Sequence, residues 1–301
     1  MKTQTGNTVL LDGKKISGDI KSELRIETEK LLASGYRAPH LVAILVGNNP
    51  ASQTYVSSKI KSCEFCGYRS TLIQFEADIT EAFLLEKLEE LNNQEDVDGI
   101  LVQLPLPSHI SEFKIIDATA PEKDVDGFHP ENIGRMAKNL PTPLPATPGG
   151  VIELLKRYNI PTFGKYCVVV GRSNIVGSPM SILMGRDAEP GNCTVTLTHI
   201  YTENLEYYTR TADILIVATG VVGLIKADMV KPGAVVIDVG ISKVPDPQNP
   251  GKTKIVGDVE FDEVAPLCSF ITPVPGGVGP MTIAILLQNT MRLYKERLHI
   301  S

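Results

Sequence analysis

Hydrophobic and polar positions follow two alternating patterns along the first 120 residues. Apolar residues at helical spacing predict helices over residues 14–33, 50–67 and 80–92. Mostly apolar runs, typical of buried strands, occupy residues 40–47, 70–75 and 98–104. The inner side of the third helix is expected to carry Phe83, Leu84, Leu88 and Leu91. Strands that alternate with helices in this way favour a parallel sheet covered by helices.

A second alternating series follows residue 146. Strands are expected over residues 166–171, 194–199, 214–219, 234–240 and 269–272. Helices are expected over residues 147–158, 177–185 and 281–298. This pattern predicts a five-strand doubly wound sheet, in which ligands bind at the carboxyl ends of strands. Residues 121–146 lack periodicity and are expected to form a functional loop, with a domain boundary near its end. The fold class is therefore α/β, with two α/β domains.

Composition argues against some classes of function and favours a cytoplasmic location. The 301 residues carry a net charge of −6, which argues against a nucleic-acid-binding protein. No apolar run approaches the roughly 18 residues of a membrane span, and the first residues lack a hydrophobic signal core. The five cysteines are scattered, so a cytoplasmic protein without disulfides is expected. Cys63 and Cys66 form C-x-x-C within one helix, where a structural or incidental role is favoured over a zinc or redox site.

The loop after the strand at residues 166–171 has the features of a dinucleotide site. Its sequence, G-R-S-N-I-V-G-S-P over residues 171–179, joins a strand to a helix, whose free N–H groups suit phosphate oxygens. The second strand of this series ends without the acid that NAD-specific sites use, whereas Arg172 suits a 2′-phosphate. NADP is thus favoured, although Arg172 could also be a surface residue. Small residues at 218–220 and 239–241 would let a nicotinamide approach the backbone, or they could be ordinary turn residues.

A second group of residues predicts a small-molecule site in the first domain. Tyr55 and Lys59 lie four residues apart on a predicted helix and therefore share a face, although an exposed pair of this kind can also have no function. Gln103 closes the strand at 98–104, and the acidic loop Asp124–Gly127 follows it. An aromatic ring, an amine, an amide and a carboxylate that converge at strand ends can bind a small molecule. The dense Pro and Gly residues of T-P-V-P-G-G-V-G-P-M-T, residues 272–282, fix an irregular backbone before the last helix.

Six motifs together give the chain a resemblance to a known family. They are Y-V-x-x-K (55–59), V-Q-L-P-L-P (102–107), P-E-K-D-V-D-G (121–127), P-A-T-P-G-G (145–150), V-V-G-R-S-x-I-V-G-x-P (169–179) and the segment 272–282. In order and spacing, the chain resembles bifunctional methylenetetrahydrofolate dehydrogenase/cyclohydrolase over nearly its whole length. The resemblance implies oxidation of 5,10-methylenetetrahydrofolate with NADP, and hydrolysis of the methenyl product to 10-formyltetrahydrofolate.

The resemblance also implies an architecture. Residues 1–146 and the C-terminal helix 281–301 would form a folate-binding catalytic domain, and residues 147–280 a Rossmann-type NAD(P)-binding domain, with a cleft between them. A homodimer through the cofactor domain is expected, with no metal, no nucleic acid and no membrane among its partners.

The family's site residues carry over to positions of this chain. Lys59 resembles the catalytic lysine, Gln103 its hydrogen-bond partner, Tyr55 the residue that stacks on the substrate rings, and Asp126 the carboxylate that binds the pterin edge. Further substrate contacts are implied for Ser52, Pro275, Gly276 and Gly277. Cofactor contacts are implied for Thr147, Gly171, Arg172, Ser173, Ile175, Ile200, Ala218, Thr219, Gly220, Ile241 and Thr282.

The chain departs from the family pattern in two places. NADP-dependent members often carry a serine, or a basic residue nearby, where this chain has Ile200 followed by Tyr201, so NAD remains an alternative cofactor. Residues 185–192 are several residues longer than in many members. The alternatives are an NAD-linked or monofunctional member, a Rossmann dehydrogenase acting on another substrate, and a dinucleotide-binding regulatory module without turnover.

Overall fold

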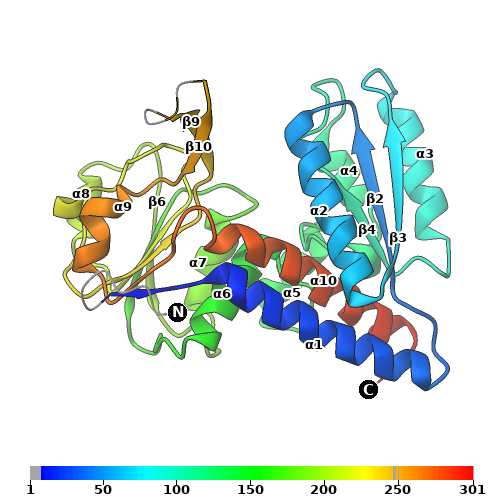
Figure 1. Ribbon diagram of the computed structural model, residues 1–301, viewed down its shortest axis with the longest axis horizontal. Helices are drawn as coiled ribbons and strands as arrows, with labels where there is room; N and C mark the ends of the chain where they lie inside the picture. The colour runs from blue at the N-terminus through cyan, green and yellow to red at the C-terminus, as the bar shows by residue number, and fades with distance from the viewer. Residues whose placement is uncertain (1–7, 247–248, 250, 301) are drawn as a thin grey trace. The chain divides into compact units, whose positions relative to one another are not determined.

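The computed structural model describes residues 8–246, 249 and 251–300, and the chain divides into two compact units (Figure 1). Gly18–Ala146 and Ile283–Ser301 form the three-stranded unit, named after its sheet. The described residues of 8–17 and 147–282 form the six-stranded unit. The unit boundaries fall inside α1 (Gly13–Ala33) and α10 (Val278–Arg297), so both helices belong to both units.

The three-stranded unit confirms the parallel sheet predicted for the first half of the chain. Its order is β3 (Arg69–Phe75), β2 (His40–Val46) and β4 (Gly99–Val102). The helices α2 (Pro50–Cys66) and α3 (Glu81–Asn92) lie on opposite sides of this sheet (Figure 1). A shorter helix, α4 (Glu112–Ala118), follows β4. Every residue of β2 is buried, as expected for the central strand of a covered parallel sheet.

The ends of these helices follow from local sequence. The Asn49 side chain accepts hydrogen bonds from the backbone N–H groups of Ala51 and Ser52, which caps α2 at its N-terminus. Gly67 ends α2 in the left-handed region, with φ 76°, where a residue without Cβ is least strained. Leu84 and Leu88 of α3 are fully buried, but the prediction for Phe83 is wrong, because its side chain is 45% exposed. Its ring instead packs edge-on against Phe75.

The prediction of a loop without secondary structure over residues 121–146 is also wrong. The segment contains a 3₁₀ turn, η1 (Pro121–Lys123), and a helix, α5 (Pro130–Ala137). The helix is short, and Asn132 within it donates to the Asp124 carboxylate at 3.0 Å. Polar contacts with other residues of the same segment, rather than a long apolar pattern, hold this helix in place.

The six-stranded unit contains the five strands predicted for the second half of the chain, a sixth strand in the same sheet, and a two-stranded hairpin that was also not predicted. Its parallel order is β1 (Val9–Leu10), β11 (Phe270–Ile271), β8 (Val235–Asp238), β7 (Ile214–Val217), β5 (Tyr166–Val170) and β6 (Thr194–Thr198). The unpredicted strand β1 pairs with β11 and is too short to show a period. The helices of this unit include α6 (Ala146–Arg157), α7 (Gly177–Gly185), α8 (Leu205–Thr209) and α9 (Phe261–Val264), with 3₁₀ turns η2 (Ala227–Met229) and η3 (Ala265–Leu267). A separate antiparallel hairpin joins β9 (Ser242–Pro245) to β10 (Thr253–Val256).

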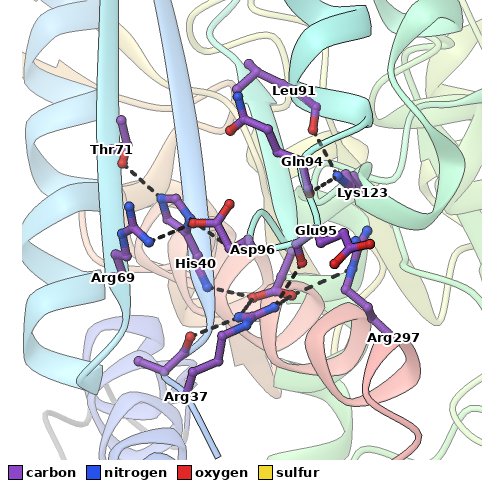
Figure 2. A network of polar contacts seen from close by, with 12 residues as sticks. Arg37, His40, Arg69, Thr71, Leu91, Gln94, Glu95, Asp96, Lys123 and Arg297 are labelled. Atoms are coloured by element: carbon purple, nitrogen blue, oxygen red, sulfur yellow. Dashed lines mark hydrogen bonds and ion pairs between the residues drawn. The ribbon is translucent and has the colours of Figure 1, made fainter.

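A network of charged residues closes the amino ends of β2 and β4 in the three-stranded unit (Figure 2). The fully buried Asp98 carboxylate accepts two hydrogen bonds from the Arg37 guanidinium, at 2.6 and 2.7 Å, and one from the His40 backbone N–H. Arg297 of α10 lies 3.7 Å from the same carboxylate. This network therefore anchors the last turn of α10 to the sheet. Within the described residues, no helix is long and apolar enough to cross a membrane.

Candidate active site and cofactor site

Each sheet contains a topological switch point, at which the strand order reverses. Many of the candidate residues lie on elements that follow the strands at this point. In the three-stranded unit, β2 pairs with β3 on one side and with β4 on the other. In the six-stranded unit, β5 pairs with β6 on one side and with β7 on the other. The loops that leave the carboxyl ends of such neighbouring strands separate, and they leave a crevice in which open α/β sheets bind ligands.

Lys59 is a buried lysine of the three-stranded unit. Its side chain lies on α2, is 6% exposed, and donates from Nζ to Oε1 of Gln103 at 3.0 Å. Gln103 directly follows β4, and its Nε2 donates to the Leu104 carbonyl at 2.6 Å, which fixes the amide orientation. Burial lowers the pKa of Lys59, because removal from water disfavours the ammonium, and the nearby Asp126 carboxylate opposes this effect. The arrangement provides an amine that can change protonation state.

Asp126 lies on a loop whose backbone is fixed from several sides. Asp124 forms a parallel bridge with Ile100 of β4, and its carboxylate accepts hydrogen bonds from the backbone N–H groups of Gly127 and His129. Gly127 has φ 70°, and a Cβ there would lie 2.6 Å from the Leu144 carbonyl carbon, so no larger residue fits. Burial raises the pKa of Asp126 to about 6, whereas the Lys59 ammonium acts to lower it.

Two buried asparagines that the sequence reasoning missed support this loop. Asn289 of α10 donates to the carbonyls of Val125 and Leu144, at 2.8 and 2.9 Å. Asn132 of α5 accepts from Thr142 and donates to Asp124. The available signal for Asn289 was a polar residue among apolar positions of the last helix, because a buried amide there requires hydrogen-bond partners.

The other candidates of the three-stranded unit also lie on α2. Tyr55 stands one turn before Lys59 and is 43% exposed, so part of its flat ring is accessible. Ser52 is buried in the first turn of the helix. Cys63 and Cys66 are buried free thiols, and burial raises their pKa values to about 12 and 11. Thiols that stay protonated at neutral pH are poor nucleophiles, in agreement with a structural role.

In the six-stranded unit, the loop after β5 has the geometry of an anion cradle. Gly171 has φ 106°, and a Cβ there would lie 2.1 Å from the Ala218 carbonyl oxygen. A Cβ on Gly177 would lie 1.8 Å from the Gly171 carbonyl oxygen, so both glycines allow a close approach that other residues would block. The Ser173 hydroxyl accepts from the N–H groups of Val176 and Gly177. Among the described residues, the N–H groups of residues 172–175 have no protein acceptor, and these residues are exposed. The loop therefore fits the phosphate groups of a dinucleotide.

Arg172 extends from this loop toward the end of the neighbouring strand β6. Its guanidinium carbon lies 5.7 Å from the centre of the Tyr201 ring, within the range of a cation–π contact. The turn that carries Tyr201 is closed by Thr202, whose N–H donates to the His199 carbonyl and whose hydroxyl accepts from the His199 N–H. Ile200 is 89% exposed and makes no comparable contribution to the turn.

The Pro- and Gly-rich segment belongs to the same unit as this loop. Gly276 has φ 109°, and Gly277 has no room for a side chain, because a Cβ would lie 2.6 Å from the Pro273 carbonyl oxygen. Thr147 and Thr282, at the starts of α6 and α10, are joined by a hydrogen bond of 3.1 Å between their hydroxyls. Pro275, Gly276 and Gly277 are therefore in a different unit from Lys59, Gln103 and Asp126.

The remaining cofactor candidates follow β7, which pairs with β5, and β8, which pairs with β7. Ala218, Thr219 and Gly220 follow β7, and Ile241 follows β8 with 47% of its side chain exposed. Two buried carboxylates that sequence reasoning missed, Asp238 and Asp258, lie beside these loops. The sequence feature that could have identified them is an acidic residue placed among apolar residues and next to, or near, a glycine. Within the described ranges, no group of three or more His, Cys, Asp or Glu side chains could hold a metal ion.

Known proteins share this architecture and sequence. Residues 11–126 match the model of the tetrahydrofolate dehydrogenase/cyclohydrolase catalytic domain, and residues 145–298 match the NAD(P)-binding domain of the same family. The bifunctional protein FolD of Bacteroides fragilis is 55% identical over 96% of this chain and 99% of that relative, and the FolD protein of Cytophaga hutchinsonii is 57% identical over 94% and 98%.

Solved structures agree with these matches. The structure of the bifunctional FolD methylenetetrahydrofolate dehydrogenase/cyclohydrolase from Campylobacter jejuni has a TM-score of 0.91 and 49% identity, and covers 96% of this chain and 99% of its own. The Trypanosoma brucei enzyme, solved with NADP cofactor and an inhibitor, has a TM-score of 0.90 and 36% identity, with 97% and 98% covered. The chain belongs to the tetrahydrofolate dehydrogenase/cyclohydrolase family.

Proposed function

We propose that this protein is a bifunctional folate enzyme that catalyses two successive reactions. It oxidises 5,10-methylenetetrahydrofolate to the methenyl cation with NADP, and then hydrolyses that cation to 10-formyltetrahydrofolate with release of a proton. The observation that carries this proposal is the buried Lys59 amine, held by Gln103 near the Asp126 carboxylate. The three-stranded unit would bind the folate, and the six-stranded unit would bind the dinucleotide.

Lys59 is the proposed proton-transfer group of the hydrolysis. Water must lose a proton as it attacks the methenyl carbon, and an amine whose pKa is lowered by burial is more readily available in the free form that accepts this proton. The cationic substrate would disfavour the ammonium further. Gln103 acts as a positioning residue, because its carbonyl oxygen accepts from Nζ and thereby directs the amine.

Tyr55 and Asp126 are the proposed binding groups for the folate. A half-exposed aromatic ring provides a stacking surface for the flat substrate rings. The Asp126 carboxylate can accept two hydrogen bonds at once from neighbouring N–H donors of a pterin, which gives orientation as well as affinity. Ser52, which is buried near the start of α2, is proposed as a further contact.

NADP is the proposed cofactor, and it accepts the hydride when bound. Arg172 is exposed on the phosphate loop, and its stack on Tyr201 would hold the guanidinium beside the adenosine ribose, where a 2′-phosphate would lie. This contact would replace the serine that many NADP-dependent members carry at the position of Ile200. Preference for NAD is the alternative, and the relative rates with the two cofactors distinguish these possibilities.

A homodimer through the six-stranded unit and a cytoplasmic location complete the proposal. Phe163 and Tyr207 of this unit are 77% and 71% exposed, which is high for large aromatic side chains and suits a protein interface. All five cysteines are free thiols, as expected in a reducing compartment. Light scattering coupled to gel filtration measures the mass, and a monomer at micromolar concentration would contradict the dimer.

The test of the proposed function is a spectrophotometric assay with methylenetetrahydrofolate. Reduced nicotinamide and methenyl absorbance are followed in parallel with NADP and with NAD. We expect faster reduction of NADP than of NAD, with little accumulation of the methenyl product. Lys59→Met should lower cyclohydrolase turnover at least about 100-fold, because a general base is lost. Lys61→Met, on an exposed position of the same helix, is the matched control and should retain it.

Each contrary outcome has a distinct meaning. Absence of turnover with both cofactors would refute the enzymatic proposal and favour a dinucleotide-binding regulatory module. Full hydrolysis by Lys59→Met would remove Lys59 from the proton-transfer role. Steady accumulation of the methenyl product by the unmodified protein would indicate a monofunctional dehydrogenase.

A further inference from the structure

Two buried carboxylates occupy the carboxyl end of the six-stranded sheet. Asp238 ends β8 and is 3% exposed, and Asp258 follows β10 and is fully buried. Burial of a carboxylate is costly unless hydrogen bonds compensate for the lost water. The proposed reaction uses neither residue as an acid, a base or a substrate contact. Their hydrogen-bond partners therefore point to their role.

Asp258 holds the loop that follows β7. Its Oδ2 accepts from the Thr219 backbone N–H at 2.6 Å, from the Thr219 hydroxyl at 2.9 Å and from the Gly220 N–H at 2.9 Å. Three donors on one oxygen leave this loop few alternative positions. Gly220 has φ 71°, a conformation in which glycine is the least strained residue.

Asp238 holds the loop that follows β8 and closes the base of the β9–β10 hairpin. Its Oδ1 accepts from the N–H groups of Gly240 and Asp258, at 2.9 and 3.0 Å, and its Oδ2 accepts from the Val259 N–H at 3.0 Å. Its backbone N–H donates to the Thr272 hydroxyl at 2.7 Å, and Thr272 is the first residue of the Pro- and Gly-rich segment. Asp238 therefore connects both arms of the hairpin to the segment after β11.

Two glycines provide the space that the carboxylates occupy. A Cβ on Gly240 would lie 2.1 Å from Asp258 Oδ1, and a Cβ on Gly257 would lie 1.9 Å from Asp238 Oδ2. Asp258 Oδ1 is buried and has no hydrogen-bond partner in the part of the chain that the structure describes. An unpaired carboxylate oxygen reduces stability. The loss of stability at Oδ1 is understandable if Oδ2 of the same carboxylate holds a functional loop in place.

We propose that Asp238 and Asp258 are a pair of positioning residues that set the two cofactor loops, 218–220 and 239–241, relative to each other. A continuous path of contacts runs from Thr219 through Asp258 and Asp238 to Gly240. The inference rests on the proposed function, because these loops carry the candidate cofactor contacts Ala218, Thr219, Gly220 and Ile241. Loss of the pair should weaken dinucleotide binding without removing a group that touches the dinucleotide.

The two activities of the proposed enzyme provide the test, because hydrolysis of methenyltetrahydrofolate needs no dinucleotide. We expect Asp258→Ala to raise the KM for NADP about tenfold, since the loop loses the oxygen that accepts three of its hydrogen bonds. Cyclohydrolase turnover, measured on methenyltetrahydrofolate alone, should stay within about twofold of the unmodified protein, since Lys59 is unchanged. Asp258→Asn keeps one acceptor oxygen and should stay within about threefold for both activities.

A second variant keeps the inference testable if Asp258→Ala does not fold. Gly240→Ala places a methyl group against Asp258 Oδ1 while every polar group remains, and it should also raise the KM for NADP. Glu263→Gln, an exposed position on α9, is the matched control for loss of one acidic charge. Direct binding is followed by titration with NADP.

The possible results distinguish failure of the positioning role from failure of the proposed enzymatic function. Asp258→Ala with an unchanged KM for NADP would overturn the inference, and so would a parallel fall in both activities, which indicates general destabilisation. An Asp258→Asn variant as impaired as Asp258→Ala would also overturn it, because the acceptor geometry would then not matter. Absence of turnover of the unmodified protein with both NADP and NAD would instead refute the proposed function.

Discussion

Replacement of Asp98 by alanine should strongly destabilise the three-stranded unit. The Asp98 carboxylate is fully buried, and it is the acceptor for the Arg37 guanidinium and the His40 N–H at the amino end of the sheet (Figure 2). Removal of one partner from a buried ion pair typically costs 3–5 kcal/mol, because the other charge stays buried without a partner. Arg37 is 34% exposed and regains some water, whereas the Arg297 Nε atom is buried without a hydrogen bond. The expected loss is therefore about 3 kcal/mol.

Asp96 provides a matched control two residues away. Its carboxylate is 51% exposed and pairs with Arg69 at 2.7 Å on the surface. Exposed ion pairs contribute roughly 0–1 kcal/mol, so Asp96→Ala should change stability by no more than this. Asp98→Asn retains one acceptor oxygen and should fall between the two alanine variants.

Urea unfolding followed by far-UV circular dichroism gives the free energy of unfolding, and hydrogen exchange of peptides from β2 and β4 assigns the change to this unit. Two units can unfold in separate transitions, so the local measurement is essential. A loss below about 1 kcal/mol for Asp98→Ala, or one equal to that of Asp96→Ala, would refute the reasoning, because the buried network would then add nothing beyond a surface pair.

Three pH-dependent predictions follow from the buried titratable groups. Because burial lowers the pKa of Lys59, cyclohydrolase turnover should rise with pH as the free amine forms, and a pH–rate profile without this rise would exclude Lys59 as the base. Asp126, with a pKa of about 6, must be ionised to accept pterin N–H donors, so the KM for folate should increase as pH falls through about 6, and Asp126→Asn should remove this dependence. Burial also lowers the pKa of His40 below 6.5, so the unfolded chain binds the proton more readily. Its contribution to stability is present above pH 6.5 and is lost as pH falls below that value, and His40→Gln should flatten the acid side of the stability curve in urea titrations at several pH values.

Most of the fold was predictable because its strands are long enough and apolar enough to identify. The runs that became β2, β5, β7 and β8 contain few polar residues, and caps such as Asn49 and Thr80 mark helix starts. The elements that escaped prediction are short. A strand of two residues such as β1 has no period, and α5 depends on the Asn132–Asp124 contact for its place.

The proposed site was partly predictable because its residues end strands or share a helix face. Tyr55 and Lys59 have helical spacing, and Gln103 follows a strand, so their proximity follows from local patterns. The hydrogen bonds by which Asn289 supports the Asp126 loop were not predicted, because Asn289 and Val125 are 164 residues apart in the sequence. Asp238 and Asp258 escaped for a related reason, since the pairing of an acid with a distant backbone N–H leaves no periodic signal.

The place of β1 has a consequence for how the protein folds during synthesis. This strand is synthesised before the other strands that the structure describes, yet its partner β11 lies some 260 residues later, and the Thr8 hydroxyl donates to the carbonyls of Ala265 and Cys268. The six-stranded sheet therefore cannot be completed until residue 271 has been synthesised, whereas β2, β3 and β4 lie within 63 residues of one another and can pair early. Nascent chains arrested before residue 270 should thus contain a protected three-stranded sheet and an unpaired β1.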